Sequence, residues 1–94
     1  MENFNKSLLS EIVDQKVKLQ IPEGSDVELT VSKVGACALD GDEWESFYVY
    51  LKGDESFHLP QGTYPITHEA FGTQDLFLSP KSPTEYEIIV NRKR

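Results

Sequence analysis

The stretch Leu59-Pro60-Gln61-Gly62-Thr63-Tyr64, together with Leu76-Phe77-Leu78-Ser79-Pro80 further on, does most to decide how this chain of 94 residues folds. Pro60 fixes φ and lacks an N–H donor, whereas Gly62 tolerates a positive φ, so residues 60–62 are expected to form a tight type II-like or bulged turn. An apolar strand should follow this turn, and a second short strand should end at Pro80. The pattern indicates fold and carries no catalytic signature.

Strand-like alternation extends from this turn in both directions. Apolar residues at every second position predict strands at residues 17–21, 27–31, 47–51, 57–59, 64–68 and 86–90, and a short run that is apolar on both faces predicts another at 76–78. Val34 breaks the alternation and Gly35 follows it, which predicts a bulge or bend. These six to seven short strands favour a mainly β domain, built as a small antiparallel barrel or sandwich, and the sequence leaves these two architectures open.

A short amphipathic helix is predicted before the strands, at about residues 6–14, with Asn5 or Ser7 as its N-cap. Its apolar stripe consists of Leu8, Leu9, Ile12 and Val13. A helix of two turns cannot persist alone, so it should dock on the sheet that follows. Length and patterning together predict one domain spanning residues 1–94.

The chain is acidic, with nine Lys and Arg against 16 Asp and Glu and a net charge of -7. This charge opposes binding to nucleic acid or to an anionic membrane, and it permits a basic partner without implying one. Arg92, Lys93 and Arg94 carry three of the nine positive charges. We expect a solvated basic tail at residues 91–94, because three charges are too few for a convincing phosphate-binding patch.

Cys37 is the only cysteine, which excludes an internal disulfide and makes the fold independent of an oxidising compartment. The N-terminus lacks the pattern of a signal peptide, and no run approaches the ~20 apolar residues of a spanning helix. These features predict a soluble protein that is used in the cytoplasm or released as part of a larger assembly.

Aromatic residues gather near the middle of the chain. Tyr48 and Tyr50 lie on the opposite side of the predicted strand from Phe47, Val49 and Leu51. Either this strand is central with both faces covered, or the tyrosines form an exposed aromatic surface; burial is favoured because Tyr is common on sheets. In the exposed arrangement, Trp44, Tyr48 and Tyr50 beside the acidic turn 40–45 would form a contact patch of the composition found at the centres of interfaces.

Residues that could carry chemistry are scattered. Cys37, His58 and His68 are too widely spaced for a zinc motif, and no nucleophile or phosphate-binding signature is present. The acidic run at 40–43 lacks the glycine and the final Glu of a calcium loop. A sheet of this size also offers little room for a pocket of ~300 Å³ or more. The sequence therefore predicts no enzyme activity, no cofactor and no metal.

Four segments resemble a family of small uncharacterised bacterial domains whose pattern reads F-x-L-x-F-x-G, L-P-Q-G-x-Y-x-x-x-H, G-x-x-x-L-F-L-x-P and Y-E. The matching segments are Phe47-Tyr48-Val49-Tyr50-Leu51-Lys52-Gly53, Leu59-Pro60-Gln61-Gly62-Thr63-Tyr64 with His68, Gly72 with Leu76-Phe77-Leu78 and Pro80, and Tyr86-Glu87. The match covers about residues 47 to 91 and keeps its spacing through three successive strands. It implies a shared fold and assigns no catalytic residue.

The resemblance also implies a structural role for the turn. Pro60, Gln61, Gly62, Tyr64 and His68 stand at family positions, where we interpret them as a turn and its packing; His68 could instead anchor a hydrogen bond to that turn. Such domains are similar in context to small accessory proteins found beside phage-tail-like collar and fibre proteins, which implies a structural or adaptor role.

We therefore expect a non-enzymatic domain that contacts another protein, as a structural or accessory component of a phage-tail-like or other multiprotein assembly. The partner's identity stays open, and self-association is not excluded. A second hypothesis is a module that binds a small ligand or carbohydrate by stacking on Trp44, Tyr48 and Tyr50. A third, weaker one is a hydrolase or metal enzyme built on Cys37, His58 and His68.

Overall fold

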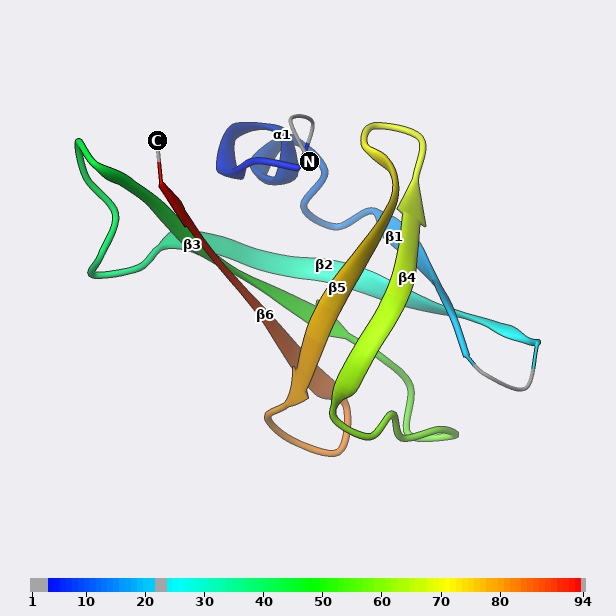
Figure 1. Ribbon diagram of the computed structural model, residues 1–94. Coiled ribbons are helices and arrows are strands. Elements are labelled where there is room, and N and C mark those ends of the chain that lie inside the picture. Colours follow the sequence, from blue (N-terminus) through cyan, green and yellow to red (C-terminus); the bar gives the residue numbers. More distant parts are fainter. Residues whose placement is uncertain (1–3, 22–23, 94) are drawn as a thin grey trace.

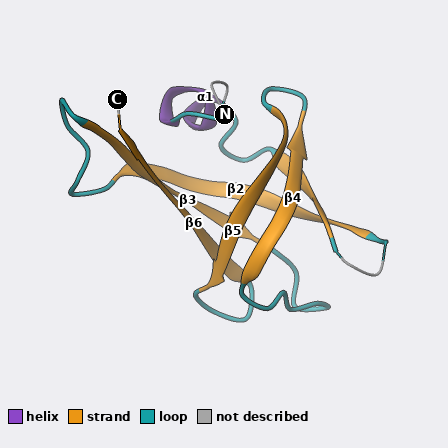
Figure 2. Ribbon diagram, in the orientation of Figure 1, coloured by secondary structure: helices purple, strands orange, loops and turns teal. Residues whose placement is uncertain are grey.

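The computed structural model describes residues 4–21 and 24–93 of the chain (Figure 1). Within these residues one short helix precedes six strands, and loops connect them (Figure 2). The elements are α1 (Lys6–Glu11), β1 (Lys16–Gln20), β2 (Asp26–Ala36), β3 (Trp44–Lys52), β4 (Gly62–His68), β5 (Gly72–Pro80) and β6 (Glu85–Lys93). The predicted mainly β fold with one short N-terminal helix is confirmed. The described helix is too short to cross a membrane.

The strands form a closed barrel in the order β1-β2-β3-β6-β5-β4. All neighbouring strands are antiparallel, and β1 closes the circle by pairing with β4. Of the two architectures that the sequence left open, the protein adopts the barrel. Because a single sheet curls on itself, one layer of inward-facing side chains is enough to make the core.

The strand predicted at residues 57–59 is absent from the described chain, so six of the seven predicted segments form strands. Residues 53–61 form a loop instead, and its end is fixed by Leu59. The Leu59 side chain is buried, and its backbone N–H donates to the hydroxyl of Tyr86 at 3.0 Å. Pro60 then removes the next donor, so no ladder can continue. The apolar residues that predicted a strand instead pack a loop onto the barrel.

Inward-facing side chains fill the barrel. The empty space left among Leu9, Val17, Val31, Ile66, Leu76 and their neighbours is about 10 Å³, which is at most the room of one water molecule. Phe4 and Leu9 are 2% and 1% exposed and close one end of the barrel, where Figure 1 shows α1. The interior is therefore a packed core and cannot hold a ligand.

The helix is shorter than predicted. Of the two candidate N-caps, Asn5 takes the role, because its side chain accepts from the N–H of Leu8 at 2.8 Å. The helix ends at Glu11, whereas the sequence predicted residues 6–14. Asp14 has a φ of 75°, in the left-handed region, and its N–H donates to the carbonyl of Val31 at 2.7 Å. The residues after Glu11 thus already turn the chain toward β1.

Strand pairing is uneven around the barrel. β3 pairs with β6 along nine residues, whereas β1 with β4 and β5 with β6 pair at two residues each. The register between β2 and β3 shifts between Val31 and Lys33, slightly before the bend that was predicted at Val34 and Gly35. One end of the long β2-β3-β6 ribbon extends beyond the other strands (Figure 1), and the molecule measures 41 × 26 × 22 Å.

Candidate functional site

An exposed group of large side chains lies on the outer side of β3 and β6. Trp44, Tyr48 and Tyr50 occupy the outward positions of β3, where Trp44 is 37% exposed and the two tyrosines are half-buried. Ile89 of β6 lies opposite Tyr48 and is 52% exposed. We call these four residues the aromatic face. Trp44, Tyr48 and Tyr50, which were predicted from the sequence, thus lie on the same side of β3, and Ile89 of β6 lies beside them.

Burial of both faces of β3, the favoured prediction, is wrong. Phe47, Val49 and Leu51 take the inward positions and are at most 2% exposed. Tyr48 and Tyr50 lie outside the buried core. The strand is therefore central in its hydrogen bonding, with a fully buried inner side and an outer side on which the two tyrosines are half-buried.

Gly35 of β2 gives the aromatic face its shape. Gly35 is paired with Tyr48, and a β-carbon at this position would collide with the hydroxyl end of the tyrosine ring. The ring of Tyr48 can therefore lie flat across β2. On its other side Tyr48 contacts Tyr50, with ring centroids 4.9 Å apart and planes tilted by 37°. Both rings are thus supported from below or from the side, which limits their freedom in the unbound protein.

Charged groups border the aromatic face at Tyr50. Lys81 forms an ion pair with Glu87 at 2.9 Å, and Glu87 lies opposite Tyr50 in the ladder. Burial and then the charge of Glu87 raise the pKa of Tyr50, while the hydrogen bond and charge of Glu87 raise the pKa of Lys81. Tyr50 therefore keeps a neutral hydroxyl that can donate or accept a hydrogen bond.

The turn that leads into Trp44 is held by backbone contacts. The carboxylate of Asp40 accepts from the N–H of Ser46 at 3.0 Å, and the N–H of Gly41 donates to the carbonyl of Trp44 at 2.9 Å. Ser46 is fully buried, and its hydroxyl is hydrogen-bonded to the side chain of Asn91. The position of Trp44 is thus defined by the turn before it and by the strand after it.

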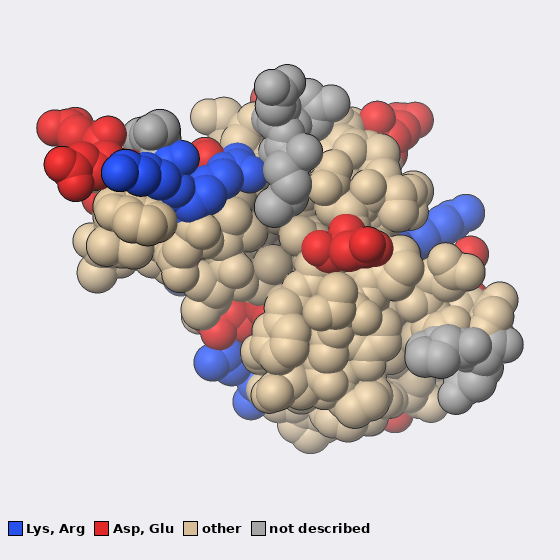
Figure 3. Space-filling model, viewed as in Figure 1, with Lys and Arg blue, Asp and Glu red and all other residues tan. Residues whose placement is uncertain are grey.

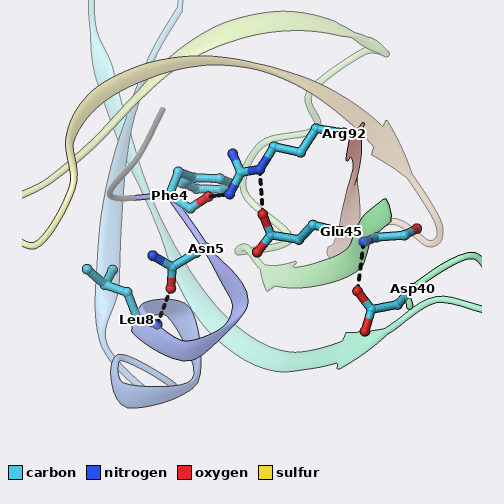
Figure 4. A network of polar contacts seen from close by, with 7 residues as sticks. Phe4, Asn5, Leu8, Asp40, Glu45 and Arg92 are labelled. Carbon is cyan, nitrogen blue, oxygen red and sulfur yellow. Dashed lines mark hydrogen bonds and ion pairs between the residues drawn. The ribbon is translucent and has the colours of Figure 1, made fainter. Parts of the chain in front are cut away.

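Arg92 ties the outer end of the ribbon to the N-terminal segment (Figure 4). Its Nε lies 2.6 Å from Glu45 Oε1, and a terminal nitrogen donates to the carbonyl of Phe4 at 2.7 Å. The guanidinium also lies 5.8 Å from the ring centroid of Phe47. Basic and acidic side chains lie side by side at this end of the molecule (Figure 3). Arg92 is thus part of a structural contact rather than of a solvated basic tail.

The predicted Pro60 turn has a different geometry. Gly62 does not have a positive φ, so the type II-like turn that would use one is not formed. Gly62 begins β4, and the hydroxyl of Tyr64 donates to the carbonyl of Pro60 at 2.6 Å. Gln61 is exposed between them. The turn is therefore held by a tyrosine side chain rather than by glycine conformation.

His68 makes its hydrogen bonds elsewhere. Its Nδ1 accepts from the N–H of Ala70 at 2.9 Å, its Nε2 is 2.9 Å from the side-chain oxygen of Gln15, and its ring stacks on Phe71. The alternative in which His68 bonds to the Pro60 turn is therefore wrong. It fixes the connection between β4 and β5 and links it to the chain just before β1.

The residues of the third hypothesis do not gather. His58 is exposed and faces the ring of Tyr86, with centroids 6.0 Å apart, while Cys37 is half-buried beside the turn before Trp44. In the described part of the chain, no group of three or more His, Cys, Asp or Glu side chains could hold a metal ion.

Two open depressions lie around Phe57 and His58, in the loop between β3 and β4. The larger, of about 680 Å³, is also lined by Pro80 and Pro83. The smaller, of about 280 Å³, also contacts Leu59 and Pro60. The expectation of little pocket volume thus holds for the interior of the barrel and not for its surface. Few polar groups converge on either depression, so the aromatic face remains the stronger candidate.

Two exposed residues had been given no role by sequence reasoning. Ile89 lies between the apolar positions of its predicted strand, and Phe77 lies within a short apolar run; they are 52% and 51% exposed. Alternation was the available signal for both. Alternation does not give the register between β3 and β6, which sets Ile89 beside Tyr48.

Comparison with known proteins gives a family. A family model described as "Domain of unknown function (DUF6916)" matches residues 4–90, which include α1 and most of β6. This agrees with the predicted membership of an uncharacterised small-domain family. No curated protein and no solved structure matches the chain.

Proposed function

We propose that this chain, which belongs to the family described as "Domain of unknown function (DUF6916)", works by binding another protein through the aromatic face. The observation that carries the proposal is the placement of Trp44, Tyr48, Tyr50 and Ile89 on one outer side of the β3-β6 ladder. Aromatic and aliphatic side chains dominate the centres of protein interfaces, while charged groups are found at their rims. Lys33 and Glu87, which flank Tyr50, fit such a rim.

The rigidity of the support favours binding. The ladder between β3 and β6 runs for nine residue pairs, and Gly35 and the two tyrosines restrict each other's positions. A surface that is ordered before contact loses little conformational entropy when a partner arrives. Tyrosine also combines a large apolar ring with a hydroxyl that can hydrogen-bond across an interface.

We place this binding role within a multiprotein assembly, in which the domain acts as a structural or accessory component and not as an enzyme. The support is the resemblance of residues 47 to 91 to small domains found beside phage-tail-like collar and fibre proteins. A net charge of -7 is compatible with a basic partner surface without implying one.

The test is capture from native lysate with three purified baits: the wild type, a Tyr48→Ser/Tyr50→Ser variant and a Gln61→Ser variant. Gln61 is exposed but lies at the Pro60 turn, away from the aromatic face. Circular dichroism and urea unfolding first establish that all three baits are folded. We expect a protein that the wild type and Gln61→Ser retain and the tyrosine variant loses, and that then binds the purified wild type directly in calorimetry. Identical captures by all three baits would reject the proposal.

The competing carbohydrate hypothesis uses the same rings. Tyr48 and Tyr50 are tilted by 37° to each other and therefore do not form one flat stacking platform, which favours a protein partner. A glycan array probed with the labelled wild type and with the tyrosine variant separates the two. A glycan that binds only the wild type would replace the protein-binding proposal.

A further inference from the structure

Two connections that are far apart in the sequence lie side by side at the end of the barrel away from α1. One is the loop between β3 and β4, and the other is the turn between β5 and β6 (Figure 1). The N–H of Gly53 donates to the carbonyl of Thr84 at 2.7 Å, so the two connections are tied to each other. The two open depressions described above, of about 680 and 280 Å³, meet here. We call this surface, formed by residues 55–60 and 80–83, the loop trough.

Rings line most of the loop trough. Phe57 and His58 line both depressions, and Pro80 and Pro83 line the larger one from the β5-β6 turn. The ring of Phe57 packs against the core, and the exposed ring of His58 faces the buried ring of Tyr86 at a centroid distance of 6.0 Å. Both rings are thus supported by packed structure, and together with the prolines they offer an apolar surface that is formed before any partner arrives.

The backbone of the loop trough cannot extend a sheet. Pro60, Pro80 and Pro83 have no N–H. Most of the other N–H groups of these residues already donate within the chain, namely those of Ser56, Phe57, Leu59, Lys81 and Ser82. A strand added from outside needs a row of free backbone groups. An occupant of the trough must therefore be held by side chains.

A proline-rich segment meets this condition. The polyproline II helix has no internal hydrogen bonds, and it docks on grooves lined by rings. Its carbonyl groups need donors, and side chains can supply them here. The imidazole of His58 makes no hydrogen bond within the described chain, and the ammonium group of Lys81 lines the same depression. The trough is also open rather than enclosed, which suits a chain that passes through it better than a small molecule that needs to be surrounded.

The charge around the loop trough favours a basic residue in that segment. Glu55 lines the larger depression, is exposed and forms no ion pair within the described chain. Asp54, its neighbour, is exposed as well. The ammonium group of Lys81 on the opposite wall lies 2.9 Å from Glu87, which neutralises it. The trough is thus bordered by negative charge that has no partner, and an Arg or Lys side chain complements this charge.

We propose that the loop trough binds a proline-rich segment of a partner protein, which lies as a polyproline II helix on the rings of Phe57 and His58 and pairs a basic residue with Glu55. The affinity comes from ring contacts and the specificity from the basic residue. This site goes beyond the proposed function, because the loop trough and the aromatic face consist of different residues.

A second copy of this chain does not fit the trough. In the described chain, Pro80 and Pro83 are the prolines with the P-x-x-P spacing that suits such a groove. They form a wall of the trough themselves, in a turn that is closed by the bond from the N–H of Lys81 to the carbonyl of Glu85 at 2.8 Å. A folded copy therefore cannot present them as an extended segment.

The test uses polarisation titrations with three fluorescein-labelled peptides of equal length. The first consists of proline with arginine at both ends, so that Glu55 can be reached in either orientation; the second has glutamate at both ends; the third keeps the arginines but replaces proline by glycine and serine. The proteins are the wild type, Glu55→Lys, His58→Ala and Glu69→Lys, and circular dichroism first establishes that all are folded. Glu69 is exposed between β4 and β5, so Glu69→Lys makes the same change of charge away from the trough.

We expect the arginine–proline peptide to bind the wild type about tenfold more tightly than either other peptide. Glu55→Lys and His58→Ala should each weaken its binding about fivefold, and Glu69→Lys should leave it unchanged. In nuclear magnetic resonance spectra the peptide should shift the amide signals of residues 55–59 and 81–82. The Tyr48→Ser/Tyr50→Ser variant should keep its affinity for the peptide, so that either proposal can fail while the other stands.

Several results would overturn the inference. These are no binding of the arginine–proline peptide up to about 1 mM, equal affinity for either other peptide, or an equal loss in Glu69→Lys. Amide shifts at Tyr48 and Tyr50 in place of the trough would assign the peptide to the aromatic face and reject the trough as its site. Shifts at the trough that grow with protein concentration in the absence of peptide would assign it to a second copy and reject the partner segment.

Discussion

Glu87 connects two residues whose protonation affects stability. Partial burial and the charge of Glu87 raise the pKa of Tyr50, and the hydrogen bond and charge of Glu87 raise the pKa of Lys81. Above about pH 10 the folded protein therefore binds more protons than the unfolded chain. Under linkage, stability that is fully present below that pH is lost as the pH rises through the folded pKa values.

We predict that Glu87→Gln flattens this alkaline loss, because it removes the charge that acts on both neighbours, while the effect of burial on Tyr50 remains. Urea unfolding of both proteins at several pH values between 8 and 11 gives the slope of the free energy of unfolding against pH. Equal slopes for wild type and variant would show that Glu87 does not set the alkaline stability of the protein.

At the scale of elements, α1 depends on the barrel and the barrel depends on α1. The helix has six residues, too few to persist alone, yet its Leu9 is buried in the end of the barrel with 1% exposure. We predict that Leu9→Ala lowers the free energy of unfolding by about 3 kcal/mol, because it leaves a cavity in a packed core. Urea unfolding measures this loss, and Leu8→Ala, half-buried on the same helix, serves as the control. Equal losses would mean that α1 does not close the barrel.

Sequence patterns predicted the elements whose signal is local. Alternation located five strands because the two sides of a strand differ in burial at every residue, and a short apolar run located β5. Residue type gave two candidate N-caps, of which Asn5 is the one used. The strand at 57–59 was wrong because Leu59 bonds to Tyr86, a contact 27 residues away. The predicted burial of Tyr48 and Tyr50 was wrong for the same reason, because no local pattern tells whether another layer covers the outer side of a sheet.

The candidate site was predictable to a similar extent. Strand parity placed Tyr48 and Tyr50 on one side without any knowledge of the fold, and Trp44 was grouped with them because it lies close in sequence. Ile89 required two things that the sequence does not state: the order of strands around the barrel and the register between β3 and β6. The pairing of strands far apart in the sequence could thus not be derived from the sequence.

At the scale of the whole molecule, Arg92 joins positions 88 residues apart by its bond to the carbonyl of Phe4. We predict that Arg92→Ala lowers the free energy of unfolding by about 1–2 kcal/mol, since it removes a charge-assisted hydrogen bond and a partly exposed ion pair. Lys93→Ala, an exposed neighbour, should change it by less than about 0.5 kcal/mol. Urea unfolding compares the two, and an equal effect would indicate that the N-terminal segment is held by packing alone.

The ribbon that carries the aromatic face also holds the single tryptophan and the single cysteine of the chain, Trp44 and Cys37, at its outer end. Tryptophan emission responds to the polarity of its surroundings, and a lone thiol takes one dye per molecule. Binding of a ligand at this surface should therefore change the emission of Trp44, and a dye attached to Cys37 should report the same binding at a second wavelength. The protein thus comes with its own optical probes for an unknown partner.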